Sequence, residues 1–192
     1  MEHVHSKIEF ILELEKLKAV LRKTKPVGLE RYENSAEHSW QTTLTALVLL
    51  DDAPAEIDAL KVLKMLLIHD VVEIDAGDVF VYDTNARAEI AEQEAAAAER
   101  IFGLLPQTIG DELLQLWHEF EGRQTAESKF AKAVDRINPV LQNLAANGQS
   151  WVENDIARHR VLAMNSEIEA ASPELWSVLE KRVLEAPFFA QE

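Results

Sequence analysis

Ionisable residues are concentrated in residues 65–78, MLLIHDVVEIDAGD, a stretch that is otherwise apolar. It carries His69 and Asp70 side by side, followed by Glu73 and Asp78. Burying such groups costs several kcal/mol each unless they are paired or bind a metal. Neutral imidazole and carboxylate are ordinary ligands of a divalent ion, and a nearby carboxylate that is not a ligand can take a proton from metal-bound water. The stretch therefore predicts a buried metal site at which water is activated.

One helix is expected to carry this stretch, beginning near Glu56 and ending at Gly77, because glycine is the favoured residue just past a helix end. On a continuous helix Glu73 lies three residues after Asp70 and four after His69. Side chains at these spacings share a face. We therefore expect Glu73 to lie beside both residues.

The other segments favour helices as well, because the chain has only six glycines and six prolines and long windows rich in Ala, Leu, Glu and Lys. The expected architecture is a single all-α domain, a helical bundle over residues 1–192 with a core of about 6–185. Apolar spacing and end signals predict helices at 6–23, 35–51, 85–103, 108–121 and 126–146, one or two more over 150–185 that break at Ser172-Pro173, and a loop at 79–84.

Candidate partners for the 65–78 stretch lie on other predicted helices. His38 falls in the first turn of the helix that Ser35 is expected to cap, and Asp135 lies within the 126–146 helix. Taken singly, such a histidine is usually a cap or core residue, and such an aspartate is usually exposed or paired with Arg.

Residues 22–35 form a local positive island that includes Arg22 and Arg31. Such cations either lie in solvent at a helix end, where the helix dipole favours them, or capture an anion. Both interpretations stay open at this point.

Composition excludes several classes of protein. A formal net charge of −15 argues against nonspecific binding to nucleic acid or to an anionic membrane, although a local basic patch could still hold a small anion. The chain has no cysteine, so any metal must take His and carboxylate ligands. The N-terminus is unlike a signal peptide and no apolar run has membrane-spanning length, so we expect a cytoplasmic protein.

Four motifs, in order and over roughly residues 8–180, resemble those of the HD-domain phosphohydrolases, and of their 5'-deoxynucleotidase branch in particular. They are EHSW at 37–40, LIHDVVE at 67–73 with GD at 77–78, LWHEFE at 116–121, and KFAKAVDR at 129–136. The resemblance implies a helical HD domain that removes phosphate from deoxyribonucleoside 5'-monophosphates.

Residue by residue, the resemblance implies that the metal ligands are His38, His69, Asp70 and Asp135. The catalytic carboxylates would be Glu73 and Asp78. The cations that bind the phosphate would be Arg22 and, as a second candidate, Arg31. Glu73 would serve as the catalytic acid or base, and Asp78 would help to position the attacking water. The loops at 29–34 and 78–83 depart from the commoner pattern, and Asp75 has no counterpart. Because the resemblance implies that these loops border the base and sugar, the identity of the substrate stays open.

The implied ligand set bears on the metal and on the mechanism. Two imidazoles and two carboxylates leave room in an octahedral shell for water and a phosphate oxygen, which favours Mn²⁺, Co²⁺ or Fe²⁺, with Zn²⁺ and Mg²⁺ as alternatives. We expect one divalent ion and direct attack by water, with no covalent enzyme intermediate. Relatives in this branch are commonly dimers, and the apolar, Trp-containing C-terminal third could supply a self-complementary surface.

Two alternatives to a nucleotidase remain. One is an HD hydrolase acting on another small phosphate ester or a signalling nucleotide. The other is a non-catalytic regulatory module that keeps the metal as a structural element. Glu73 and Asp78 favour an enzyme, because a purely structural site needs its ligands but no additional acid.

Overall fold

A computed structural model describes residues 2–53 and 56–189. Ten α-helices are found in this part of the chain: α1 (Glu2–Leu14), α2 (Ser35–Leu49), α3 (Ala59–Ile68), α4 (Glu73–Ala76), α5 (Thr84–Phe102), α6 (Gln107–Gly122), α7 (Ala126–Ala145), α8 (Gln149–Glu153), α9 (Arg158–Asn165) and α10 (Pro173–Leu184). Four short 3₁₀ helices accompany them: η1 (Glu15–Ala19), η2 (Leu50–Asp52), η3 (Ser166–Ala170) and η4 (Pro187–Phe189). The described residues form no strand, so the prediction of an all-α fold is confirmed.

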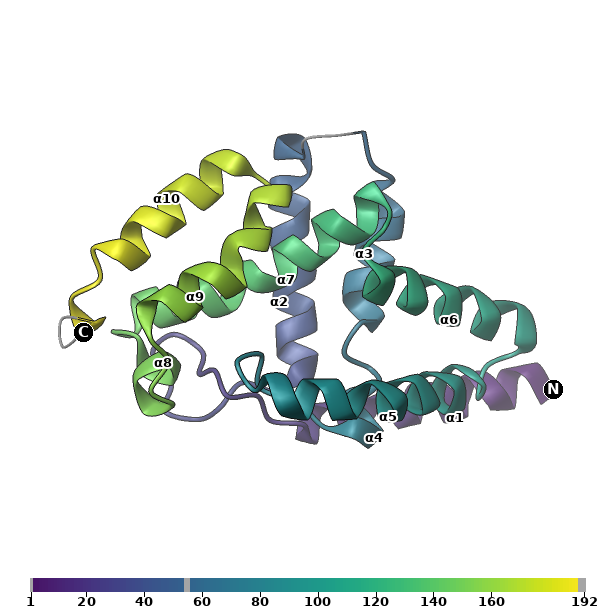
Figure 1. Ribbon diagram of the computed structural model, residues 1–192. Coiled ribbons are helices and arrows are strands. Elements are labelled where there is room, and N and C mark those ends of the chain that lie inside the picture. The colour runs from purple at the N-terminus through teal and green to yellow at the C-terminus, as the bar shows by residue number, and fades with distance from the viewer. Residues whose placement is uncertain (1, 54–55, 190–192) are drawn as a thin grey trace.

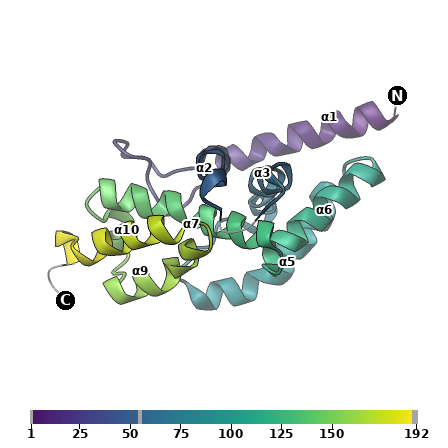
Figure 2. The ribbon, with the colours of Figure 1, turned by 90° about the horizontal axis from the view of Figure 1, so that it is seen from above.

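Helices α2, α3 and α7 pack against one another at the centre of the molecule (Figure 1). On one side α6 covers α3 and α7, α5 packs on α6, and α4 packs on α5. On the other side η3, α9 and α10 cover α7. Viewed from above, α2 and α3 are seen nearly end-on, and α1 lies on the side of the molecule away from α9 and α10 (Figure 2). The central three helices are therefore the elements that position any buried site.

The first helix ends earlier than the predicted residue 23. It gives way to η1, which ends at Ala19, because the next residues bond to the segment before α2 instead of continuing the helix. The Arg22 amide donates to the Glu33 carbonyl at 2.8 Å, and the Ser35 amide donates to the Val20 carbonyl at 3.1 Å. Residues 20–35 thus form a loop whose two ends are paired.

The predicted helix over residues 56–76 is also shorter and is interrupted. It begins at Ala59 after the N-cap Asp58, and α3 ends at Ile68. A tight turn over residues 69–72 follows, in which the Glu73 amide donates to the Asp70 carbonyl three residues back at 3.0 Å. The expected end is confirmed, because Gly77 caps α4 with a φ of 78° that other residues rarely adopt.

Two further end signals can be compared with the structure. The N-cap of α2 is Asn34 and not Ser35, because the Asn34 side chain and Glu37 form a reciprocal capping box. The predicted break before α10 is confirmed, since Ser172 is its N-cap and Pro173 its first residue.

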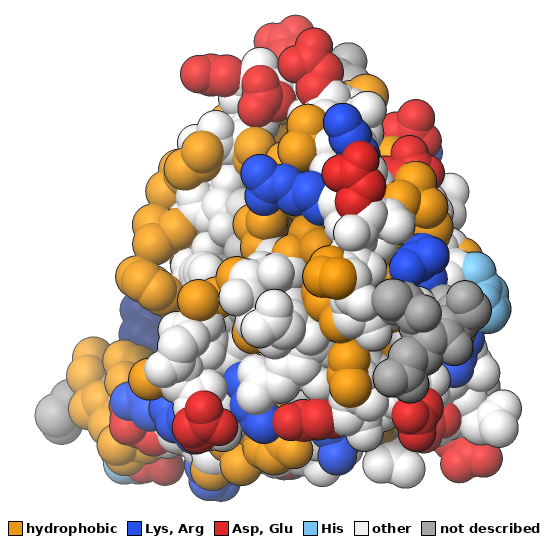
Figure 3. Space-filling model, turned by 90° about the vertical axis from the view of Figure 1, so that its left-hand side faces the viewer, with side chains coloured by type: hydrophobic (Ala, Val, Ile, Leu, Met, Phe, Trp, Pro, Cys, Tyr) orange, Lys and Arg blue, Asp and Glu red, His pale blue; other side chains and the backbone are white. Residues whose placement is uncertain are grey.

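Large apolar side chains are exposed on α1, α2 and α3, and we call this set the outer face: Val4, Ile8, Ile11, Leu12, Trp40, Leu44, Leu47, Val48, Leu60 and Leu67. Figure 3 shows hydrophobic side chains gathered along one edge of the molecule, below a group of acidic side chains. Within the described chain, none of the helices combines the length and apolarity needed to cross a bilayer.

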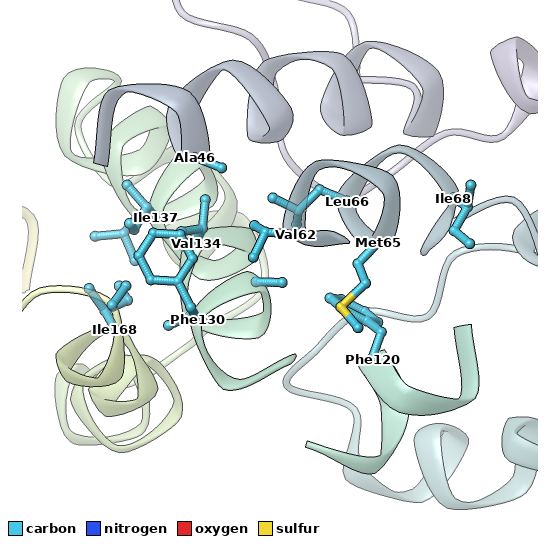
Figure 4. Packing of buried hydrophobic residues seen from close by; sticks show 14 of the residues in the cluster. Ala46, Val62, Met65, Leu66, Ile68, Phe120, Phe130, Val134, Ile137 and Ile168 are labelled. Atoms are coloured by element: carbon cyan, nitrogen blue, oxygen red, sulfur yellow. The ribbon is translucent and has the colours of Figure 1, made fainter. Parts of the chain in front are cut away.

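The hydrophobic core surrounds α7. Figure 4 shows Val134 and Ile137 of α7 near Ala46 of α2, with Met65 of α3 packed close to Phe120 of α6. All five are buried. This packing fixes α2, α3, α6 and α7 relative to one another.

The C-terminal aromatic residues belong to the body of the molecule. Trp151 and Trp176 are buried, and the Phe189 ring stacks on Trp151 with centroids 5.8 Å apart. The tail therefore packs on the body as far as Phe189; Ala190 lies outside the described residues. Because both tryptophans are buried within the chain, neither contributes to an exposed surface of the C-terminal third.

Candidate metal centre

Three of the predicted ligands converge from the three central helices. His38 lies in the first turn of α2, His69 directly follows α3, and Asp135 lies in the middle of α7. Asp135 Oδ1 is 2.9 Å from His38 Nε2 and 3.4 Å from His69 Nε2. Ligand atoms of the three side chains all lie within 4.8 Å of one another, so these residues could hold a metal ion.

Asp70 lies at the edge of this cluster. Its Oδ1 is 3.1 Å from His69 Nε2 and its Oδ2 is 3.9 Å from His38 Nε2. The same Oδ2 accepts a hydrogen bond from Arg22 at 2.9 Å. One carboxylate therefore faces both the histidines and the arginine.

The tautomer of His69 suits a metal ligand. Its Nδ1 is 2.8 Å from the Leu66 carbonyl, which can only accept, so Nδ1 carries the hydrogen and Nε2 keeps its lone pair. That Nε2 is buried without a hydrogen-bond partner in the described chain. Trp117 Nε1 also donates to the His69 carbonyl at 3.2 Å and helps to fix the residue. A buried lone pair directed at two carboxylates fits a bound cation.

The charges of the cluster favour positive charge between His38 and Asp135. Burial and Arg22 both oppose protonation of His38, but Asp135 and Glu33 outweigh them and raise its pKa to about 9. Burial also opposes ionisation of Asp135, yet the contacts with His38 and His69 hold its pKa well below the ordinary value. The donor set therefore fits a divalent ion electrostatically as well as in composition.

Glu73 and Asp78 lie beside this cluster and next to Arg22. Arg22 Nη1 is 3.5 Å from an Asp78 oxygen and 3.9 Å from a Glu73 oxygen. Burial and the Asp70 charge raise the pKa of Glu73 well above its usual range, against the opposing effect of Arg22. Burial likewise raises the pKa of Asp78, and Arg22 only partly offsets the increase.

A cavity of about 210 Å³ adjoins these groups. Its lining includes the charged residues Arg22, Asp70, Glu73, Asp78 and Asp135, and also Tyr82, Trp117, Trp151 and Asn165. Such a cavity offers both charged groups and aromatic surface, which suits a small molecule that has an anionic group and a ring.

Arg31 lies elsewhere. Its side chain is 54% exposed and bonds to Glu37, with Nη2 2.8 Å from Oε2, and it does not line the cavity. Glu37 holds it there because the capping box fixes that carboxylate at the surface end of α2. The structure therefore brings together every predicted site residue except this one.

Sequence reasoning missed Glu33 and Lys132. Glu33 is 1% exposed and its Oε2 lies 3.4 Å from His38 Nδ1, although the sequence suggested only a counter-charge in the positive island. Lys132 lines the cavity and bonds to Glu121 at 3.0 Å. Only the positions of these residues in the sequence could have indicated a role in the site. Glu33 directly precedes the N-cap residue of α2, and Lys132 lies in the motif that contains Asp135.

Two histidines and an aspartate that converge from three packed helices define a helical metal-binding domain. The chain belongs to the HD-domain family, because a model of the HD domain matches residues 14–176. A crystal structure of a predicted metal-dependent phosphohydrolase from Magnetospirillum magnetotacticum MS-1 is 38% identical, covers 99% of this chain and 98% of that one, and superposes with a TM-score of 0.92.

Curated relatives carry a more specific name. The 5'-deoxynucleotidase HDDC2 of Xenopus laevis is 31% identical over 139 residues, which are 70% of this chain and 68% of the relative. HDDC2 of Homo sapiens is 30% identical over 115 residues, or 60% of this chain and 55% of the relative. The chain thus spans little more than half the length of the human relative that it matches.

Proposed function

We propose that this chain is a metal-dependent phosphomonoesterase that removes phosphate from nucleoside and deoxynucleoside 5'-monophosphates. The observation that carries the proposal is the buried cluster of His38, His69 and Asp135, which opens on a cavity with an arginine and two further carboxylates. The names of similar proteins, 5'-deoxynucleotidase and metal-dependent phosphohydrolase, support the same class of reaction.

In this proposal His38, His69, Asp70 and Asp135 hold one divalent ion. Two nitrogen and two carboxylate donors favour Mn²⁺, Co²⁺ or Fe²⁺ over a closed tetrahedral zinc site. When bound, the ion supplies positive charge that offsets the charge of the phosphate and makes water more acidic.

The residues around the ion carry the remaining roles. Arg22 donates to the phosphoryl oxygens and stabilises their charge as the P–O ester bond breaks. Asp78 orients the water whose oxygen forms the new bond to phosphorus. Glu73 accepts the proton that this water loses, and the nucleoside leaves as an alcohol after taking a proton from solvent. The overall reaction converts a phosphate monoester and water into an alcohol and inorganic phosphate.

The test is phosphate release from a panel of deoxyribo- and ribonucleoside monophosphates. Metal-stripped protein is resupplied with Mn²⁺, Co²⁺, Fe²⁺, Mg²⁺ or Zn²⁺, and the Glu73→Ala variant is assayed beside it. We expect metal-dependent release that Glu73→Ala abolishes while the variant still binds metal. Absence of release with every metal, although binding is demonstrated, would refute the nucleotidase.

We also infer that the chain forms a homodimer through the outer face. The buried side of α2 carries small or polar residues, including His38, Ser39 and Thr42, whereas its exposed side carries Trp40 and Val48 with Leu44 and Leu47. This arrangement is the reverse of an ordinary surface helix, which turns its apolar side inward. A partner is needed to cover the exposed side.

The extent of the outer face suits a second copy of this chain. Helix α1 packs on the body through Phe10 and Leu14 and still exposes a separate apolar stripe, which includes Ile8 and Ile11. A specific dimer buries about 800 Å² on each partner. The outer face offers ten large apolar side chains, each between 43% and 77% exposed, for such an interface.

Light scattering of the purified protein tests the dimer. We expect wild type to have twice the mass of the chain and Val48→Glu, on the outer face, to be monomeric. Val178→Glu is the matched control, because that valine is exposed on α10 and lies outside the outer face. A monomeric wild type, or a Val48→Glu variant that remains dimeric, would refute this interface.

The expected partner is therefore a small nucleotide rather than a nucleic acid polymer or a membrane, in keeping with the net charge of −15. We also propose a cytoplasmic location, for two reasons. Nucleotides are cytoplasmic metabolites, and a chain without cysteine needs no oxidising compartment.

A further inference from the structure

Glu33 is the most deeply buried carboxylate that the proposed reaction does not use. It is 1% exposed and lies in the loop before α2, five residues ahead of His38. A buried carboxylate is costly unless several donors satisfy it. Its surroundings therefore indicate what the structure gains from keeping it.

Two neutral donors fix the orientation of the Glu33 carboxylate. Gln142 Nε2 of α7 donates to Oε1 at 2.5 Å, and Thr24 Oγ1 donates to Oε2 at 3.0 Å. Because each oxygen has its own donor, the carboxylate has a single orientation. That orientation directs Oε2 at His38 and Arg22.

His38 Nδ1 faces this oxygen at 3.4 Å, on the opposite side of the ring from the nitrogen that lies beside Asp135. The His38 side chain is fully buried, and its Nδ1 has no hydrogen-bond partner of good geometry in the described chain; its contact with Glu33 Oε2 at 3.4 Å is an ion pair. A carboxylate behind a metal-binding histidine keeps the hydrogen on the ring nitrogen that faces the carboxylate. The other ring nitrogen, which faces the metal, thereby becomes a better ligand.

The same residue holds Arg22. The Glu33 carbonyl accepts from the Arg22 amide at 2.8 Å, the Glu33 amide donates to the Thr24 carbonyl at 2.9 Å, and Oε2 lies 3.5 Å from Arg22 Nε. Glu33, which lies behind His38, thus also holds Arg22 in position.

We propose that Glu33 is a positioning residue that fixes the tautomer and orientation of His38 for metal binding and anchors Arg22 beside the same site. This inference rests on the proposed metal-dependent function. It predicts that His38 Nδ1 carries a hydrogen in the metal-bound protein, and that loss of the Glu33 charge weakens metal binding while the fold is retained.

The first test is calorimetric titration of the full-length, metal-stripped protein with Mn²⁺ in the absence of nucleotide. Glu33→Gln keeps the shape of the side chain, and we expect it to weaken binding by about 10- to 100-fold. Glu37→Gln is the matched control, because Glu37 adjoins His38 in sequence but its carboxylate bonds to Arg31 at the surface; it should change affinity less than twofold. Equal affinity of Glu33→Gln and wild type would overturn the proposal.

The second test needs no variant, so it remains decisive if Glu33→Gln fails to fold. Nitrogen–proton correlation spectra of wild type loaded with Zn²⁺ report which histidine nitrogen carries the hydrogen. We expect His38 to be protonated at Nδ1, and a hydrogen-free Nδ1 would overturn the inference. A wild type that binds neither metal would instead refute the metal-dependent function itself, which separates the two failures.

Discussion

Helix α7 contributes to two buried polar regions, and they differ in how well their hydrogen bonds are satisfied. Near its end, Asn143 Oδ1 accepts from the Ser150 amide and hydroxyl at 2.9 and 3.0 Å and from the Trp151 amide at 3.2 Å. The Asn143 amide group also donates to the Pro139 carbonyl at 2.9 Å. This region is neutral, and the side chain of Asn143 uses both of its polar atoms.

Two turns earlier, the region around Asp135 is charged and incompletely satisfied. His69 Nε2 and Glu73 Oε2 are buried without a hydrogen-bond partner in the described structure. Burial raises the pKa of Glu73, so its ionised form is disfavoured there. A satisfied polar region stabilises a fold, whereas an unsatisfied one costs stability and persists when binding or catalysis needs it. The two regions should therefore respond oppositely to mutation.

The largest expected effect is that of Glu73→Gln. We expect kcat/KM to fall by about 10³-fold, or about 4 kcal/mol, because glutamine cannot accept the proton from water. The free energy of unfolding of the metal-free variant at neutral pH should rise by about 1 kcal/mol, since a buried carboxylate next to Asp70 is removed. Assays with a deoxynucleotide and urea unfolding measure the two quantities.

The pH dependence of that stability gain has a definite sign. The pKa of Glu73 is raised in the folded protein, so the unfolded chain ionises first and folding is penalised above the ordinary Glu value. The advantage of Glu73→Gln should therefore grow as the pH rises above the ordinary Glu value toward the raised pKa of the folded protein, and disappear as the pH falls below about 4.5, where both states bind the proton. A variant that is less stable than wild type at neutral pH would contradict the comparison.

Metal binding should stabilise the folded protein next most strongly. A ligand at 100 times its Kd adds about 2.7 kcal/mol, which corresponds to a rise in Tm of about 5–10 °C for a domain of this size. We expect this rise for wild type with Mn²⁺ and its absence for Asp135→Asn, which lacks a ligand. Thermal unfolding with and without the ion, followed by circular dichroism, provides the measurement.

Asn143→Ala should lower the stability of the protein without affecting metal binding, which is the opposite of the result expected for Asp135→Asn. Removal of the side chain leaves the backbone amides of Ser150 and Trp151 without their acceptor, and we expect a loss of about 2 kcal/mol in the free energy of unfolding. The rise in Tm on adding Mn²⁺ should persist, because no proposed ligand is altered. Loss of that rise would show that the two regions of α7 are not separable.

Much of the fold follows from local sequence signals, because each acts within a few residues. Helix spacing and the end signals at Gly77 and Ser172-Pro173 place the end of α4, the bounds of α7 and the start of α10 to within a few residues. The order of the motifs, with the family resemblance, also named the residues that meet around Asp135. The helix ends could be predicted because they depend on local spacing and on short patterns.

Two of the differences involve contacts between distant segments. The first helical segment, α1 followed by η1, stops at Ala19 because residues 20–22 pair with 33–35. The buried state of Glu33 depends on Gln142, which lies 109 residues away. No periodicity in the sequence reports such pairings. The sequence did not predict the outer face. An apolar stripe on a helix ordinarily indicates the side that faces the core, whereas the buried side of α2 carries the site residue His38.

The smallest expected effect on activity is that of removing Arg31, which the sequence analysis grouped with Arg22 as a phosphate-binding candidate. Arg31 is satisfied at the surface, where both of its terminal nitrogens bond to Glu37, whereas Arg22 is buried and its Nε has no hydrogen-bond partner in the described chain. We expect Arg31→Ala to change kcat/KM less than twofold, because exposed ion pairs contribute little and Arg31 does not line the cavity. Arg22→Ala in the same assay should lower kcat/KM by about 10²-fold, since it removes the cation proposed to meet the phosphate. A loss for Arg31→Ala as large as that for Arg22→Ala would mean that the loop over residues 20–35 moves to bring Arg31 onto the substrate.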